Sequence, residues 1–218
     1  MRSLRAPLLA LSLALAATVS VPPAARASVS FAVAYDDMVS DSDAVAVVTA
    51  LEHQSVWEDN RIVTYTHLRV EEGIAGSLAT GAETWVRTLG GSVGKIGQQV
   101  GGEPVFVTGK SSLIFARATK PGTFSVVARA QGQFPVLVDP ATKRRSVMKN
   151  ANCGLLVPRV EPTSSSASTA PAPAGVAPRA LAPATVGAAR VVAVDALHGR
   201  SLEDVARDIS TQWKRLHK

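Results

Sequence analysis

Cysteine and histidine are both scarce in this sequence: of its 218 residues, one is cysteine (Cys153) and four are histidine. A single thiol cannot form a disulfide within the chain, and it excludes zinc sites that are built from several thiolates. The four histidines do not stand at the short, regular spacings of paired metal ligands. We therefore expect no metal site and no cofactor.

The sequence also lacks an apolar run of the roughly 20 residues that a transmembrane helix needs. Its most apolar stretch, residues 7–21, follows Arg2 and Arg5 and precedes a small-residue pattern at residues 25–27. This three-part order is typical of a secretory signal peptide that is cleaved after Ala27. We expect residues 1–27 to be removed, which leaves a periplasmic or extracellular protein without a transmembrane segment. An uncleaved N-terminal anchor is the alternative.

Charge of one sign is not concentrated in the predicted mature chain. Removal of Arg2, Arg5 and Arg26 lowers the formal net charge from +6 to +3. The one basic cluster, within residues 143–149, follows an Asp-Pro pair and is interpreted as a solvated hairpin tip. So small an excess of positive charge does not indicate a nucleic-acid partner, and none is predicted.

Between Val45 and Pro158 no window has the periodicity of an amphipathic helix. Short β-rich runs occur instead at residues 44–51, 62–72, 84–89, 112–117, 124–130, 134–139 and 145–148, and glycine or proline lies in most of the gaps between them. Six or seven strands in a domain over residues 28–158 predict a mainly β fold, a small barrel or a sandwich. In the second run, alternation places Ile62, Thr64, Thr66, Leu68 and Val70 inward and Val63, Tyr65, His67, Arg69 and Glu71 outward.

Residues 162–189 are almost entirely Ala, Pro, Ser, Thr and Gly. Such a composition cannot bury enough apolar surface to offset the entropy of ordering, so residues 159–200 are predicted to form a disordered linker. A capping Ser201, acidic residues in the first turn and an apolar stripe then predict an amphipathic helix over residues 201–218. A helix this short is marginal alone, so we expect it to dock on the β domain. Capture by a partner or a membrane surface is the alternative.

Residues 90–94 match the G-x-S-x-G pattern, whose serine is a nucleophile when a helix follows at once. Residues 95–102 are instead rich in glycine, which favours a loop. We interpret this segment as a recognition loop that contains Gly90, Gly91, Ser92, Gly94, Lys95, Gly101 and Gly102. Cys153 is expected to be a small buried hydrophobic residue, with a reactive thiol or an intermolecular disulfide as alternatives.

Several short motifs together resemble a β domain of exported bacterial proteins, a family to which no activity is assigned. The motifs lie at residues 42–45, 62–66, 90–94, 101–106 and 131–134 (Gln-Gly-Gln-Phe). The chain is also distantly similar to the netrin-like domains of metalloproteinase inhibitors, which implies a small OB-like barrel, closed or partly open. Those inhibitors act through an N-terminal cysteine, whereas the expected N-terminus here is Ser28. The resemblance therefore implies the topology and not the inhibitory mechanism.

These observations lead to the hypothesis of an exported, non-enzymatic binding module that recognises a protein or another envelope or extracellular component. Two other classes stay open. One is a small secreted hydrolase that uses Ser92 or Cys153, and the other is a structural protein of the cell envelope.

Overall fold

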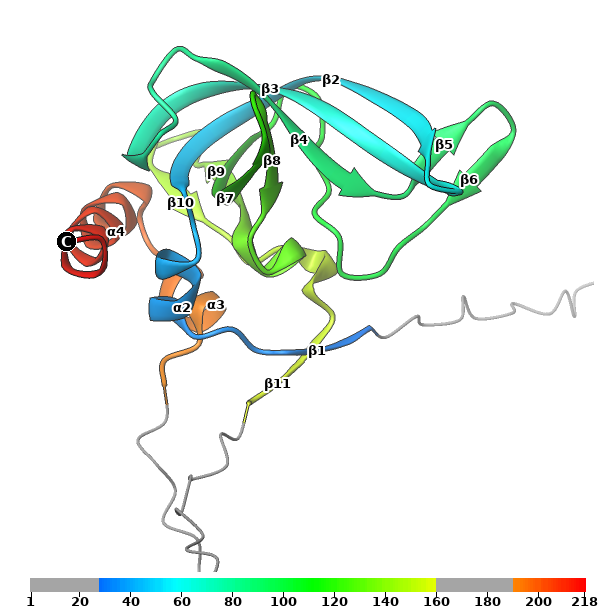
Figure 1. The fold of residues 1–218 in the computed structure, drawn as a ribbon. Helices are drawn as coiled ribbons and strands as arrows, with labels where there is room; N and C mark the ends of the chain where they lie inside the picture. Colours follow the sequence, from blue (N-terminus) through cyan, green and yellow to red (C-terminus); the bar gives the residue numbers. More distant parts are fainter. Residues whose placement is uncertain (1–27, 160–189) are drawn as a thin grey trace, which may run out of the picture.

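The protein is described by a computed structural model that covers residues 28–159 and 190–218. The predicted signal peptide and most of the predicted linker lie outside the described residues. Seven strands form the main sheet, in the order β10-β9-β7-β2-β3-β4-β8 (Figure 1). They are β2 (Ala44–Glu58), β3 (Arg61–Gly76), β4 (Glu83–Leu89), β7 (Ser111–Lys120), β8 (Thr123–Val126), β9 (Gln133–Val138) and β10 (Arg145–Val147).

Five of these strands close into a ring because β8 pairs both with β4 and with β7. Around the ring the strands follow the order β2, β3, β4, β8, β7. The fifth strand of the ring in the sequence, β8, therefore lies between the third, β4, and the fourth, β7. The β4–β8 contact is parallel, and the other pairings in the ring are antiparallel. The mainly β fold predicted from the sequence is confirmed, with five strands of the sheet in a ring.

The long hairpin of β2 and β3 follows directly from local sequence. Asp59 and Asn60, with φ of 48° and 60°, form its two-residue turn, a conformation that these two residue types tolerate. Along β3 the predicted alternation holds for Ile62, Thr66, Leu68 and Val70, which are buried. Val63 was assigned to the outward face but is fully buried. Its cross-strand partners are the apolar Val56 and Leu89, which contribute to that burial.

Two apolar cores lie on opposite sides of the same strands. Inside the ring, β2, β3, β4, β7 and β8 bury a cluster that includes Val48, Leu68, Val86, Ile114 and Phe124. The outer side of β2, β7 and β9 buries a second cluster beneath the helices, with Val47, Phe115 and Phe134 among its strand residues. Strands with both faces buried read as continuous apolar runs, as residues 44–48 do.

The second core is covered by α2 (Tyr35–Ser40), α3 (Ala193–Leu197) and α4 (Leu202–Leu216), which gather on one side of the sheet (Figure 1). The predicted C-terminal helix is confirmed as α4, and Ser201 caps it by accepting a hydrogen bond from Asp204 N–H. Leu202, Val205 and Ile209 are fully buried in the second core.

The predicted linker ends earlier than residue 200. The structure resumes at residue 190, and α3 buries Ala193, Val194 and Leu197. The prediction was made from the composition of the segment alone. It does not take into account that the sheet offers an apolar surface on which these side chains are buried.

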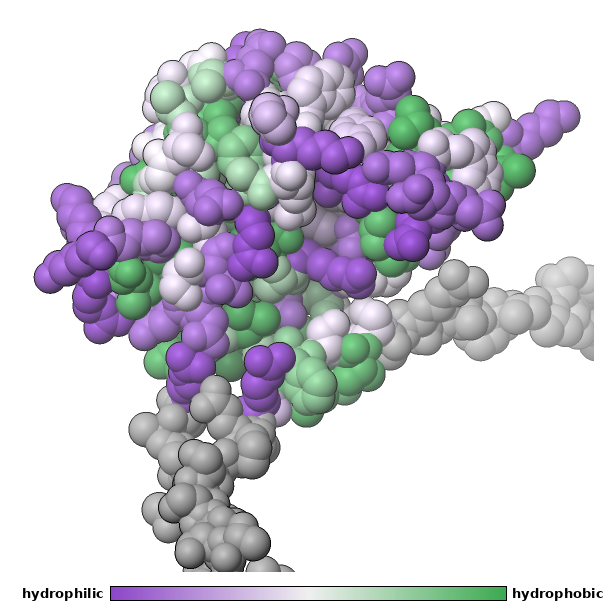
Figure 2. Space-filling model, viewed as in Figure 1, coloured by the Kyte–Doolittle hydropathy of each residue, from purple (hydrophilic) through white to green (hydrophobic). Residues whose placement is uncertain are grey.

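Two small sheets complete the fold. β1 (Val29–Phe31) pairs in parallel with β11 (Leu155–Val157), and together they expose Val29, Phe31, Leu155 and Val157 at the lower edge of Figure 2. β5 (Gly91–Val93) and β6 (Ile96–Gln98) form a hairpin that projects from the ring (Figure 1). None of these four short strands is predicted from the sequence.

Candidate binding surface

The glycine-rich segment predicted as a recognition loop forms the β5–β6 hairpin and the irregular chain after it. Gly94, with φ of 60°, and Lys95 make the tip of the hairpin. Ile96 on β6 is 56% exposed, and hydrophobic atoms lie beside polar ones at this end of the molecule (Figure 2). At the base, a Cβ on Gly91 would collide with the hydroxyl oxygens of Thr64 and Ser55. Glycine at this position therefore lets the hairpin lie directly on β2 and β3.

The geometry around Ser92 is not that of a nucleophile elbow. Ser92 lies in β5, and the chain continues into β6 rather than into a helix. In the part of the chain that the structure describes, no hydrogen bond joins Ser92 to a histidine or an acidic side chain. His198 instead accepts a hydrogen bond from the backbone N–H of Lys149 at 3.1 Å.

The segment that follows the hairpin is anchored by side-chain amides and a carboxylate. Gln98 Oε1 accepts a hydrogen bond from Ile62 N–H at 2.7 Å. Glu103, 8% exposed, accepts one from Leu89 N–H at 3.0 Å. Gln133 is fully buried, and its amide both accepts from Val105 N–H at 2.9 Å and donates to the Val105 carbonyl at 2.8 Å. These contacts hold the hairpin and the chain after it in one position.

The outward side of β3 and β4 carries a row of aromatic and charged side chains. It is the face of β3 opposite to Thr64, against which Gly91 at the base of the hairpin packs. We call Glu52, Glu58, Tyr65, His67, Glu83, Trp85 and Arg87 the β3–β4 face. The cross-strand register places Tyr65 opposite Arg87 and His67 opposite Trp85. The two pairs are therefore neighbours on one side of the sheet.

Glu58 connects the first pair. Arg87 Nε lies 3.0 Å from Glu58 Oε2, and Tyr65 donates its hydroxyl hydrogen to the same oxygen at 3.2 Å. The hydrogen bond from Arg87 holds the pKa of the Glu58 carboxyl below its ordinary value. The carboxylate thus fixes the positions of an arginine and a tyrosine on this face.

The second pair is a stack of His67 on Trp85, with ring centroids 4.6 Å apart and planes inclined by 14°. Glu83 Oε2 lies 3.0 Å from Nε2 of the imidazole, and Glu52 Oε1 lies 3.5 Å from Nδ1. Both edges of the imidazole therefore meet a carboxylate while its face covers the indole. The stack and its flanking acids form a partly exposed, ordered surface.

The sequence predicts part of the β3–β4 face. Period-two alternation assigns Tyr65 and His67 to the outward side of β3, and both are half-buried there. It does not identify Trp85 and Arg87 as their neighbours, because that pairing depends on the register between β3 and β4. An aromatic residue at alternate outward positions of two successive strands is the signal that points to such a surface.

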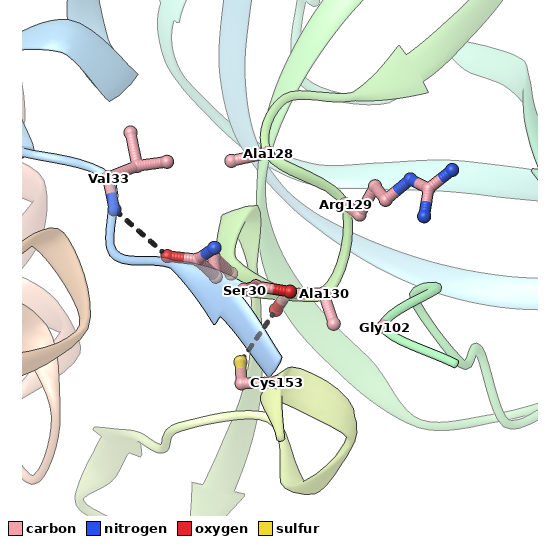
Figure 3. Close-up of a pocket in the computed structure, with 8 residues that line it drawn as sticks. Ser30, Val33, Gly102, Ala128, Arg129, Ala130 and Cys153 are labelled. Carbon is pink, nitrogen blue, oxygen red and sulfur yellow. Dashed lines mark hydrogen bonds between the residues drawn. The ribbon is translucent and has the colours of Figure 1, made fainter. Parts of the chain in front are cut away.

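Cys153 lies in a small hollow of about 200 Å³ between β1 and the turn after β8, together with Ser30, Val33 and Ala128 (Figure 3). The side chain is 2% exposed, and its thiol donates to the Ala130 carbonyl at 3.3 Å. Burial raises the pKa of the Cys153 thiol. The buried environment predicted for this residue is thus present, and it disfavours the thiolate that a nucleophile needs.

Gln131 and Gly132, in the Gln-Gly-Gln-Phe motif next to this hollow, both have structural roles. The Gln131 amide accepts from Val33 N–H at 3.0 Å and donates to the Phe31 carbonyl at 3.0 Å, so it substitutes for a neighbouring strand along β1. A Cβ on Gly132 would collide with the Val127 carbonyl oxygen. The motif is therefore structural, because its two glutamines bind two separate chain segments to the sheet.

Two kinds of feature are absent from residues 28–159 and 190–218. No group of three or more His, Cys, Asp and Glu side chains is placed to hold a metal ion there. No helix in these residues is both long enough and apolar enough to span a bilayer.

Comparison with known proteins does not assign the chain to a family. No family model matches it, and no curated protein matches it. The function must therefore be argued from the surface itself.

Proposed function

We propose that this chain is an exported, non-enzymatic binding module that recognises a protein or another envelope or extracellular component. The proposed binding regions are the β3–β4 face and the β5–β6 hairpin, whose base packs on the other face of β3. Export is inferred from the signal-peptide pattern of residues 1–27. The observation that carries the proposal is the stack of His67 on Trp85 between two carboxylates, which is an ordered aromatic surface with no part in either apolar core.

The composition of this face supports recognition of a macromolecule. Tyrosine, tryptophan and arginine are the residue types that most often dominate binding energy at protein interfaces. Here Tyr65, Trp85 and Arg87 lie on two adjacent strands, and the Glu58 carboxylate already holds Tyr65 and Arg87 in place. Little side-chain entropy is lost when such groups bind, which favours affinity.

Topology gives a second, weaker support, which is an analogy between folds. OB-type folds bind ligands on the face of their second and third strands. In this chain β3 and β4 are the second and third strands of the ring, and the β3–β4 face lies on their outward side. Analogy of fold alone does not establish function, so the side chains carry the proposal.

The surroundings of Ser92 and Cys153 do not favour the hydrolase hypothesis. Ser92 has no general base among the described residues, and Cys153 has a buried thiol of raised pKa. A test is labelling with a fluorophosphonate and with iodoacetamide. We expect the native protein to react slowly or not at all, and rapid labelling that is lost in Ser92→Ala or Cys153→Ala would instead indicate an enzyme.

The proposed surface can be tested by site-specific photocrosslinking in the cells that produce the protein. A benzophenone amino acid replaces Tyr65 on the β3–β4 face or Lys95 at the hairpin tip. The matched control places it at the exposed Thr211 on α4, a helix that contributes no residue to the β3–β4 face. We expect the two test positions to give the same crosslinked partner, which mass spectrometry identifies, and the control position to give none.

Two substitutions then test whether this surface contributes to the binding free energy of the partner. Trp85→Ala and Arg87→Ala should each weaken binding of the identified partner by at least about tenfold, as expected for a loss of 1.4 kcal/mol or more. Thr211→Ala should leave binding unchanged. Equal crosslinking from the control position, or normal binding by both face variants, would show that this surface is not the binding site. A structural envelope protein would instead crosslink mainly to its own copies.

A further inference from the structure

A second hollow, of about 260 Å³, lies beside the β3–β4 face, where the start of β3, the end of β4 and the turn after β8 meet. Three arginines from these three places line it: Arg61, Arg87 and Arg129. Ser125 contributes a hydroxyl and Glu103 a carboxylate, and apolar side chains make up the rest of the lining. Three arginines and one glutamate thus line a hollow large enough for a small ligand group.

Two of the arginines are already held in position. Arg87 Nε pairs with Glu58 Oε2 at 3.0 Å, and Arg129 Nε pairs with Glu103 Oε1 at 3.0 Å. Both ion pairs run through Nε, so neither pair engages the terminal nitrogens of the guanidinium. Arg61 is exposed and takes part in no ion pair or hydrogen bond between side chains of the described residues. The hollow therefore combines two pre-positioned arginines with one that is free to close on a ligand.

The backbone that carries Arg129 is strained. Ala128 and Arg129 have φ of 54° and 56°, the left-handed region that residues other than glycine seldom occupy. Such conformations cost free energy and gather at ligand-binding positions. In Figure 3 the guanidinium of Arg129 is turned away from Cys153 and the smaller hollow. The strained turn thus directs the guanidinium away from that smaller hollow.

Glu103 holds this arrangement without offering a free acceptor to the hollow. One of its oxygens is paired with Arg129, and the other accepts from Leu89 N–H at 3.0 Å. Both oxygens are therefore committed to protein donors. Glu58, which pairs with Arg87, is a second carboxylate near the hollow, so the three arginines and the two carboxylates leave a formal charge of +1.

We propose that the hollow between Arg61, Arg87 and Arg129 binds the tetrahedral oxyanion of a phosphate or sulfate group. A carboxylate has two oxygens, whereas a phosphate or sulfate ester presents three terminal oxygens, one toward each of three guanidinium forks. The hydroxyl of Ser125 adds a neutral donor, as is common at oxyanion sites. This site shares Arg87 with the β3–β4 face, but it needs neither the His67–Trp85 stack nor the β5–β6 hairpin. Its test varies Arg61, which is not part of that face, so the two proposals can fail separately.

The test measures how oxyanions raise the unfolding temperature of the purified protein and, by titration calorimetry, how tightly they bind. The probes are inorganic phosphate, inorganic sulfate, glycerol 3-phosphate and glucosamine 6-sulfate, each compared with chloride at matched ionic strength. Arg61→Gln is the main variant because this exposed side chain supports no described contact, so folding is preserved. Arg69→Gln is the matched control, since Arg69 is exposed on the same strand but lies outside the hollow.

We expect at least one oxyanion to stabilise and bind the wild type, and Arg61→Gln to weaken that binding by about tenfold or more. Arg69→Gln should change it by less than about twofold, as a distant surface charge does. Tighter binding of an ester than of the inorganic ions would identify a group carried on a larger molecule, and equal binding would identify the free ion. No stabilisation beyond chloride, or equal losses in the two variants, would overturn the proposal.

Discussion

Replacement of Gln133 by leucine tests how the segment after the β5–β6 hairpin is held against the ring. Gln133 is fully buried, and its amide exchanges two hydrogen bonds with the backbone of Val105. Its Oε1 also accepts from Asn150 Nδ2 at 2.6 Å. Leucine has a similar volume, so the substitution removes these bonds without opening a large cavity.

The expected cost follows from which groups lose their partners. Val105 lies in an exposed loop, where water can replace both of its bonds. Asn150 is 5% exposed, so its amide group is left buried without its acceptor, at a cost of about 1–3 kcal/mol. With a smaller contribution from the loosened loop, we expect Gln133→Leu to lower the free energy of unfolding by about 2–4 kcal/mol.

Urea unfolding measures that loss, and hydrogen exchange locates it. In Gln133→Leu the amide of Val105 should exchange faster, while the amide of Val33 stays protected. Gln131→Leu is the matched control, because its amide makes the equivalent pair of bonds to Phe31 and Val33 on the other side of the turn. It should give the reverse pattern. A cost below about 0.5 kcal/mol, or the same exchange pattern in both variants, would refute the proposed anchoring role of Gln133.

Other substitutions test the fold in the same way. Gly91→Ala should cost more stability in urea unfolding than Gly94→Ala, because a Cβ at Gly91 meets two side-chain oxygens whereas Gly94 faces open space; equal costs would contradict this close packing. Ile209→Ala should lower the free energy of unfolding by about 2–5 kcal/mol, since Ile209 lies on the side of α4 that faces the second core and is fully buried. A negligible loss would mean that α4 is not docked. Tyr35→Phe should leave stability unchanged or raise it by up to about 1 kcal/mol, because the Tyr35 hydroxyl is buried without a partner among the described atoms. Burial raises the pKa of Tyr35 to about 12, from 10.0. The wild type should therefore lose stability as the pH rises from about 10 towards 12, and Tyr35→Phe should lose less over that range in pH-dependent thermal unfolding.

The candidate surface shows where prediction from sequence succeeds. Alternation along residues 62–70 assigns Tyr65 and His67 to the outward side, because the two-residue period of a strand is a local property. The glycine-rich pattern marks residues 90–102 as an unusual loop, but it does not predict that Gly91 lies against Thr64 and Ser55. The functional interpretation of that loop stays a proposal.

Prediction fails where the contact joins distant parts of the chain. Glu103 looks like an ordinary loop residue in sequence, yet it joins Leu89 to Arg129. The linker is predicted to reach residue 200, yet Ala193 and Leu197 are buried against the second core. In each case local composition describes only the residues that are near in sequence. Burial and contacts depend on residues that are distant in sequence and adjacent in the folded chain.

Local patterns in the sequence are sufficient for the mainly β class, the turn at Asp59 and Asn60, and the capped helix that begins after Ser201. Each depends on residues within a few positions of one another, where backbone preference and side-chain periodicity act directly. The pairing of β8 with both β4 and β7, and the meeting of Arg61, Arg87 and Arg129 around one hollow, emerge when the whole chain folds. Those placements depend on burial of two apolar cores by the whole chain, because no local pattern specifies which distant strands share a core.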